Sequence, residues 1–167
     1  LGDAEVWQAA AHNAYWVLLA VVPIGVGLLL AVLLHRAQPF GARFYRTIVF
    51  VPYVVPVVAT ALAWGWIYHP SWGALNAVIS ALSGSEAHHP WLGAPSTALV
   101  SLAMAANWTG YGYCMMLFLG GLASVDESLY EAARIDGANL WTQFTNVTLP
   151  GISNTLNLVV LLVFINT

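Results

Sequence analysis

The sequence predicts an all-α protein, a polytopic bundle of transmembrane helices with a short helix–turn–helix on its cytoplasmic side. Three observations lead to this fold class. Of the 167 residues, 60% are apolar and only 7% are charged, whereas a soluble domain of ordinary composition has about 25% charged residues. Four apolar stretches are separated by polar ones, and the apolar lengths suit a bilayer. One long polar segment, 126–150, lies between the last two apolar stretches.

The first predicted span covers residues 14–34, which carry no charged side chain. Pro23, Gly25 and Gly27 interrupt it, and such residues are tolerated in membrane helices. The residues before it, 1–13, are mixed in character and contain a tryptophan. Because tryptophan is enriched at the membrane–water boundary, we expect this segment to form an interfacial lead-in.

The loop after the first span indicates the cytoplasmic side. Residues 35–46 hold three of the four arginines in a chain without lysine, and cytoplasmic loops carry the excess of basic residues. The second predicted span, 47–68, follows this loop. We expect Pro52 and Pro56 to kink its first half.

The segment 69–95 contains neither arginine nor lysine and is rich in turn-forming residues, so we expect it on the external side. Within it, apolar residues recur with helical spacing from Leu75 to Leu82. This pattern predicts a short amphipathic helix that ends near Gly84.

The third predicted span, 97–123, has polar and small residues in its middle, from Asn107 to Tyr113. Polar groups at membrane depth need partners or face a water-filled cavity, so this run is a candidate functional site. Hydrogen bonds between helices, with glycines that allow close packing, explain the same residues equally well.

The polar segment 126–150, which we call the elbow, is predicted to form two short helices joined at a glycine bend. Ser128 and Glu131 have the spacing of a capping box, which opens the first helix. Gly137 lies where a residue just past a helix needs a positive φ. Asn139 is expected to cap the second helix.

The second helix of the elbow should present Leu140, Phe144 and Val147 on one face, since they follow helical spacing. Pro150 either ends this helix or starts the next element. The fourth apolar stretch, 152–167, barely reaches spanning length and continues to the last residue. We therefore expect an incomplete fourth span and a chain that is part of a longer protein.

The elbow also contains a recognisable motif. Glu131-Ala132-Ala133 is followed after three residues by Gly137, and then by Val147-Thr148-Leu149-Pro150. This spacing resembles the EAA loop in permease subunits of bacterial ATP-binding-cassette (ABC) importers, with valine in place of the usual isoleucine. The extended run YEAARIDGA, residues 130–138, is similar to the carbohydrate-uptake branch, which includes maltose and glycerol-phosphate permeases.

The resemblance implies a type I importer permease that forms half of the pore for a sugar or related polyol in the bacterial cytoplasmic membrane. Its implied partners are cytoplasmic ABC ATPases, a second homologous permease, an extracytoplasmic solute-binding protein and the lipid bilayer, without nucleic acid. ATP and Mg would be bound by the ATPase, and this chain would need no cofactor. The residues expected to couple the ATPase are Glu131, Ala132, Ala133, Asp136, Gly137, Leu149 and Pro150.

For a sugar, the side chains at membrane depth with suitable chemistry are Asn107, Trp108 and Tyr111. They combine a hydrogen-bonding amide with aromatic faces, and we expect them along the substrate path. As noted for the third span, helix packing is the alternative explanation for aromatic residues at this depth.

Enzymatic chemistry is not indicated. A P-loop needs a lysine, and the chain has none, so we expect ATP hydrolysis in a partner subunit. The closest approach to a metal site is Glu86, His88 and His89. Adjacent histidines point apart and no further ligand lies nearby in sequence, so we expect an exposed turn and no metal.

Two other functions are compatible with a membrane bundle. An ion-driven transporter or channel would need acids inside its spans, and the central parts of the predicted spans contain none. A non-transporting scaffold would use the elbow only to recruit a soluble protein. Such a scaffold would have no substrate path, which the polar run near Asn107 disfavours.

Overall fold

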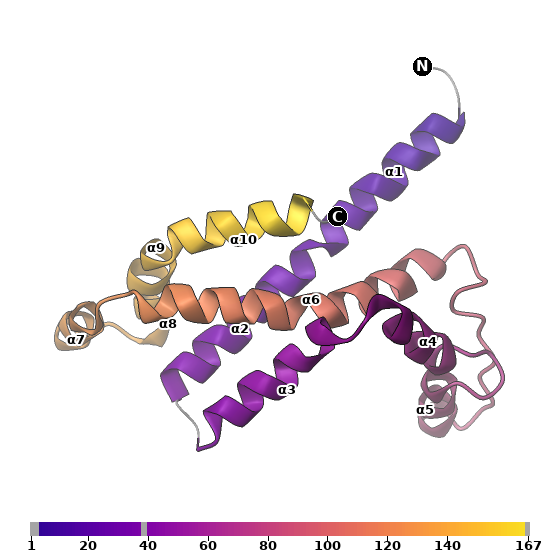
Figure 1. Ribbon diagram of the computed structural model, residues 1–167, viewed down its shortest axis with the longest axis horizontal. Helices are drawn as coiled ribbons and strands as arrows, with labels where there is room; N and C mark the ends of the chain where they lie inside the picture. The colour runs from indigo at the N-terminus through magenta and orange to yellow at the C-terminus, as the bar shows by residue number, and fades with distance from the viewer. Residues whose placement is uncertain (1–3, 38–39, 166–167) are drawn as a thin grey trace.

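The computed structural model of the protein describes residues 4–37 and 40–165, and every regular element in these ranges is helical. The helices are α1 (Ala4–Leu19), α2 (Val21–Ala37), α3 (Ala42–Val54), α4 (Val57–Ile67), α5 (Ala74–Ser83), α6 (Ala98–Ala123), α7 (Glu127–Ile135), α8 (Leu140–Gln143), the π-helical turn η1 (Phe144–Thr148), α9 (Leu149–Gly151) and α10 (Ser153–Ile165). Figure 1 shows α6 in the middle of the bundle, with α2, α3 and α10 packed along it. The elbow lies at one end of α6, and α4 and α5 lie at the other.

The first predicted span lies within a longer helix. α1 and α2 together give a 32-residue apolar helix, Val6–Ala37, which among the described residues is the one helix that is long and apolar enough by itself to cross a membrane. Residues 4–13 are part of this helix, so it begins earlier than the predicted span. The rest of the predicted lead-in, 1–3, lies outside the described residues.

The second predicted span is broken into two helices. α3 and α4 meet at an angle of 96°, and the break falls at Val55 and Pro56, both with extended backbone (ψ 130° and 140°). A residue before proline avoids the helical region, which explains the position. The break is sharper than the predicted kink, and Pro52 takes no part in it because it stays inside α3.

The long central helix α6 is not among the candidate membrane spans. Counting α3 with α4 and Leu140–Gly151 with Ser153–Ile165 as one span each, the described residues offer at most three candidate spans. α6 is not among them, although its 26 residues would reach about 39 Å at 1.5 Å per residue. The polar run 107–113 lowers its hydropathy, so the span 97–123 stays a prediction.

The segment 69–95 is ordered around one buried side chain, Asn76. α5 ends, as predicted, at Gly84, which has φ +69°. The Asn76 amide nitrogen donates to the carbonyls of Pro70 (2.9 Å) and His89 (3.0 Å). Its oxygen accepts from the Trp91 indole nitrogen at 2.8 Å. A single amide thus fixes the start of α5 to two parts of the loop.

The two arms of the elbow follow the predicted outline with one correction. The cap of α7 is Asp126, whose carboxylate accepts from the Ser128 backbone N–H at 2.9 Å. The predicted capping box at Ser128 is therefore wrong, because the helix starts two residues earlier. Gly137 has the expected positive φ, +76°. Asn139 caps α8, and its side-chain oxygen accepts from the Thr142 N–H at 2.9 Å.

The second arm is not a regular α-helix. After α8 the chain forms the π-helical turn η1, and a bend of 71° follows between Leu140–Gly151 and α10. A π-helix has a wider repeat than an α-helix, so the predicted face of Leu140, Phe144 and Val147 does not continue in helical register. Pro150 lies inside α9 just before the bend.

Two glycines let α6 come close to the backbones of α2 and α3. A Cβ atom added to Gly27 in α2 would lie 2.6 Å from the Cys114 Cβ and 2.9 Å from the Met115 nitrogen. One added to Gly112 in α6 would lie 2.9 Å from the Val49 carbonyl carbon. Backbones approach this closely in membrane helix pairs when the residue at the contact is small. The alternative explanation of the polar run, close packing at glycine, therefore holds for Gly112.

Candidate functional site

The elbow is an exposed surface at one end of the bundle. Glu131 and Asp136 are exposed, and the apolar side chains beside them are exposed as well, Ile135 at 85% and Leu140 at 71%. Large apolar residues that remain in contact with solvent mark interaction sites. The elbow therefore has both the charge and the apolar area that a protein partner would contact.

The two arms of the elbow are fixed to one another. The Tyr130 hydroxyl lies 3.1 Å from the Thr148 hydroxyl, so α7 is hydrogen-bonded to η1. The Gln143 side-chain amide donates to the Ala138 carbonyl at 2.9 Å across the glycine bend. Thr148 is fully buried, at 1% exposure. The elbow can therefore move as one unit when a partner pushes on it.

The elbow also carries a shifted carboxylate. The Ser128 backbone N–H stabilises the charged form of Asp126 and lowers the pKa of this carboxyl below its ordinary value of 3.8. The cap is therefore charged at neutral pH, where it favours the N-terminus of α7.

The structure places the seven predicted coupling residues in three elements. Glu131, Ala132 and Ala133 lie in α7, Asp136 and Gly137 form the bend, and Leu149 and Pro150 lie in α9. All are exposed except Ala133 and Leu149, which are partly buried. The predicted residues thus lie along both arms and the bend of the elbow, mostly exposed to solvent.

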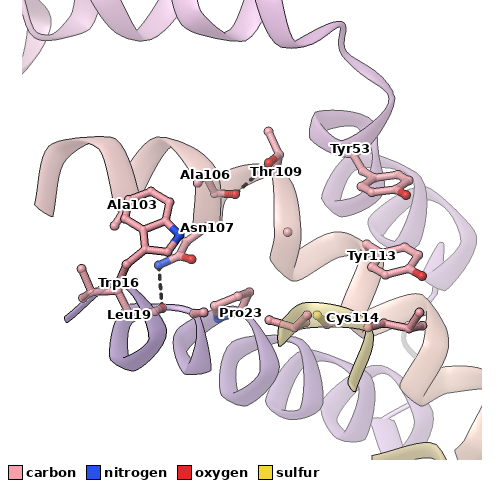
Figure 2. Close-up of a pocket in the computed structure, with 14 residues that line it drawn as sticks. Trp16, Leu19, Pro23, Tyr53, Ala103, Ala106, Asn107, Thr109, Tyr113 and Cys114 are labelled. Atoms are coloured by element: carbon pink, nitrogen blue, oxygen red, sulfur yellow. Dashed lines mark hydrogen bonds between the residues drawn. The ribbon is translucent and has the colours of Figure 1, made fainter. Parts of the chain in front are cut away.

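A cavity of about 330 Å³ lies in the middle of the bundle between α1, α2, α3, α6 and α10. Figure 2 shows Asn107, Thr109 and Tyr113 of α6 around it, with Trp16 of α1 and Tyr53 of α3. Its lining combines amide and hydroxyl groups with several aromatic rings. Such a mixture of apolar walls and a few polar groups is typical of small-molecule sites.

Asn107 enters this cavity because of a proline on another helix. Pro23 has no N–H, so the carbonyl four residues earlier, at Leu19, loses its helical partner. The Asn107 side-chain nitrogen donates to that carbonyl at 3.2 Å, as Figure 2 shows. The interhelical hydrogen bond expected from the polar run therefore exists, and the Asn107 oxygen remains on the cavity side of the contact.

Two tyrosines form the opposite wall. The rings of Tyr53 and Tyr113 are stacked, with centroids 4.7 Å apart and an angle of 13° between their planes. The stack is possible because Gly112 lets α3 approach α6. Tyr53 and Tyr113 thus offer an aromatic surface in the same cavity that Asn107 lines.

Of the three predicted substrate-path residues, only Asn107 lines this cavity. Trp108 packs its ring edge-to-face on Trp64, with centroids 6.0 Å apart, and the Tyr111 carbonyl faces Gly27. Side chains three or four positions apart share a helix face, so the spacing from Asn107 points to Gly110 and Tyr111. Gly110 lines the cavity and Tyr111 does not, so helical spacing alone does not separate them. Sequence reasoning missed Thr109, Tyr113, Trp16 and Tyr53.

His88 and His89 take separate partners in the structure. The His88 Nε2 atom lies 3.4 Å from a Glu86 carboxylate oxygen, while His89 contacts the Thr97 hydroxyl at 3.0 Å. In the part of the chain that the structure describes, no three His, Cys, Asp or Glu side chains could hold a metal ion together.

The helical bundle and its elbow have counterparts among known proteins. The family described as "Binding-protein-dependent transport system inner membrane component" matches residues 24–167. The chain belongs to this family. Members of the family are inner membrane components by that description, and the resemblance inferred from the elbow is confirmed.

Two curated relatives show which part of the family is similar. The chain is 33% identical over 150 residues to the probable ABC transporter permease protein YurN of Bacillus subtilis (strain 168), covering 89% of this chain and 51% of that protein. It is 35% identical over 127 residues to the maltose/maltodextrin transport system permease protein MalF of Shigella flexneri, covering 76% of this chain and 24% of that protein. The chain thus spans about half the length of YurN and about a quarter of MalF.

Solved structures confirm the fold. A bacterial ABC transporter involved in the import of the acidic polysaccharide alginate superposes with a TM-score of 0.79 at 21% identity, covering 96% of this chain and 56% of that chain. A second alginate transporter structure, in complex with an alginate pentasaccharide-bound periplasmic protein, gives a TM-score of 0.76 at 22% identity and covers 93% and 52%. The predicted all-α importer-permease fold is therefore confirmed.

Proposed function

We propose that the chain is the central part of an ABC importer permease, which forms half of a pore for a sugar or related polyol and is coupled through the elbow to a separate ATPase. The observation that carries this proposal is the exposed elbow itself. It presents the Glu131-Ala132-Ala133 motif and a left-handed Gly137 in a chain of the binding-protein-dependent transport family. The proposed membrane is the bacterial cytoplasmic membrane, which the protein crosses several times.

Glu131 is the proposed charged contact to the ATPase, because its carboxylate is exposed on α7 and makes no ion pair within the described residues. A basic residue on the ATPase would pair with it. The neighbouring apolar side chains, Ile135 and Leu140, would fill a groove on the same partner. Gly137 sets the angle between the two arms, since its φ of +76° strains any other residue.

Transport then follows from movement of the elbow as one unit. Two ATPases close on ATP and Mg, which they and not this chain would bind, and displace the elbows of two homologous permeases. Each bundle rocks between inward-facing and outward-facing states, a rigid-body transition. A solute-binding protein would deliver the substrate at the outer face, and the periplasmic protein seen with the alginate transporter supports this role.

The proposed substrate contacts are the groups that line the central cavity. Asn107 supplies an amide oxygen, and the stacked Tyr53 and Tyr113 supply hydroxyls and an aromatic face. Sugars present both hydroxyl groups and apolar ring faces, so this lining suits them. The names of two relatives, a maltose permease and an alginate importer, support a saccharide. Trp108 and Tyr111, which do not line the cavity, would act indirectly by packing.

The test is ATP hydrolysis by the full-length permease, co-expressed with its genomic neighbours and reconstituted in lipid nanodiscs with a binding protein and a panel of sugars. We expect one sugar to stimulate hydrolysis and Glu131→Gln to abolish the stimulation. Glu86→Gln, the same change in the external loop, should leave it intact. A purified complex without ATPase activity would contradict the importer and favour the channel or the scaffold. ATPase activity that no sugar stimulates would contradict the proposed sugar substrate, while the importer function would stand.

A further inference from the structure

A second cavity, of about 480 Å³, lies between the end of α2, the end of α6 and the elbow. Its lining is polar and differs from that of the central cavity. It includes His35 and Arg36 from α2, Tyr130 and Arg134 from α7, and Glu127 as its one carboxylate. Two arginines from different elements therefore line one space, a partly buried Arg36 and an exposed Arg134.

Arg36 is the residue that makes this cavity unusual. Its Nη2 atom is buried and has no hydrogen-bond partner, while its guanidinium carbon lies 6.0 Å from the centre of the Tyr130 ring. A cation over an aromatic face gains some electrostatic stabilisation. The ring does not satisfy the buried N–H groups of Nη2, and a buried polar group without a hydrogen bond is costly.

The carboxylate in the cavity does not supply the missing partner. Within the described residues, the one ion pair under 4.0 Å is that of His88 with Glu86, at the other end of the bundle. Glu127 therefore pairs with neither Arg36 nor Arg134. With histidine counted as neutral, two positive charges face one negative charge, so the cavity has a net charge that favours an anion.

We propose that this cavity binds a phosphate group, held by Arg36 and Arg134. Guanidinium groups match phosphate because their planar fork donates two parallel hydrogen bonds to its oxygens. Two kinds of ligand carry such a phosphate group: a phosphorylated small molecule from the cytoplasm, and the headgroup of an anionic phospholipid in the inner leaflet. Binding depends on the cations of the cavity and not on the transported solute, so it is tested separately from the importer function. Its effect on transport rests on the proposed coupling to an ATPase.

Binding at this place would have a mechanical effect. Arg36 belongs to the bundle and Arg134 to the elbow, so one phosphate would connect the two. The Tyr130 hydroxyl joins α7 to η1 at 3.1 Å, and the connection would therefore extend to the whole elbow. A ligand that binds one position of the elbow more tightly than the other shifts the population toward that position. Phosphate would thus regulate how readily the ATPase moves the bundle.

The test uses the full-length permease in nanodiscs made only of phosphatidylcholine, with inorganic phosphate as the probe and chloride at matched ionic strength as the reference. Binding is followed by the shift of the thermal unfolding midpoint with phosphate concentration. We expect Arg36→Gln and Arg134→Gln to weaken binding about tenfold or more, since each removes a charge-assisted hydrogen bond. Arg43→Gln, an exposed arginine of α3 outside the cavity, should leave it unchanged.

A second arm separates the two sources. In nanodiscs that contain 30 mol % phosphatidylglycerol, loss of the phosphate-induced shift in the wild type would identify the lipid headgroup as the occupant. Persistence of the shift would identify a soluble phosphate compound. Arg36→Lys keeps the positive charge over Tyr130 but loses the two parallel hydrogen bonds of the guanidinium group, so it should bind phosphate with intermediate affinity. This variant shows whether weak binding by Arg36→Gln comes from the lost charge or from a folding defect. Equal binding by wild type and Arg36→Gln would overturn the proposal. So would an unfolding midpoint that changes neither with inorganic phosphate nor with phosphatidylglycerol.

Discussion

Replacing Gly112 with alanine tests whether the contact between α3 and α6 shapes the central cavity. The new Cβ would lie 2.9 Å from the Val49 carbonyl carbon and 3.0 Å from the Phe50 Cα, and closer still to the Val49 oxygen. Ordinary contact begins near 3.4 Å, so the backbone of α3 must retreat by at least 0.5 Å. Overpacking of this kind costs about 1–3 kcal/mol.

The retreat of α3 should also change the cavity. Tyr53 moves with α3, so its stacking on Tyr113 weakens, and such a pair contributes about 0.5–1.5 kcal/mol. We expect Gly112→Ala to lower the thermal unfolding midpoint of the full-length permease and to raise KM for uptake. Both quantities are measured in nanodiscs, with and without the transported sugar.

The matched control is Gly120→Ala on the same helix. A Cβ at Gly120 meets no atom within 4 Å, and alanine is the better helix former by about 1 kcal/mol. This variant should be as stable as the wild type or slightly more so. If Gly112→Ala and Gly120→Ala show equal stability and equal KM, the close approach of α3 and α6 does not control the cavity.

Three further predictions concern the elbow and the cavity. Gly137→Ala should lower the free energy of unfolding by about 1 kcal/mol, because alanine resists a left-handed backbone. It should also reduce sugar-stimulated ATPase activity, and full stimulation would show that the bend angle is unimportant. Tyr113→Ala should raise KM for uptake while basal ATPase activity persists, since it removes one wall of the cavity and the partner of Tyr53; an unchanged KM would remove it from the substrate path. For Asp126 the pKa is lowered in the folded state, so its capping of α7 is present above pH 3.8 and is lost as the pH falls through the lowered value. Hydrogen exchange should therefore show extra protection of α7 at pH 5 relative to pH 3 in the wild type, and a smaller difference in Asp126→Asn.

Two features of the elbow were predicted correctly from the sequence, and each of them depends on one residue alone. A glycine is needed where φ is positive, and Gly137 supplies it. Asn139 is predicted as a cap because asparagine is a preferred capping residue, and the structure shows its side chain accepting from the Thr142 N–H. The cap of α7 was misplaced because Asp126 and Ser128 are both good capping residues, and only the backbone conformation decides between them.

Features that depend on two elements were harder to predict. Asn107 was identified from its polarity, but Tyr53 joins the cavity through the approach of α3 to α6, which depends on packing at Gly112. The chain break at Pro56 and the continuation of the helix through Pro52 involve the same residue type. Their difference comes from the tertiary path of the chain, because proline propensity is the same at both positions.

The hydrogen bond from Asn107 to the Leu19 carbonyl links the centre of α6 to the junction of α1 and α2. The acceptor is available because Pro23 cannot donate to it, so the junction depends on a side chain from another helix for its last hydrogen bond. A solute that competes for the Asn107 amide would weaken this contact, and any movement that carries the junction away from α6 would release the amide. By thermodynamic reciprocity, occupancy of the cavity and the geometry of the first helix must then influence each other equally.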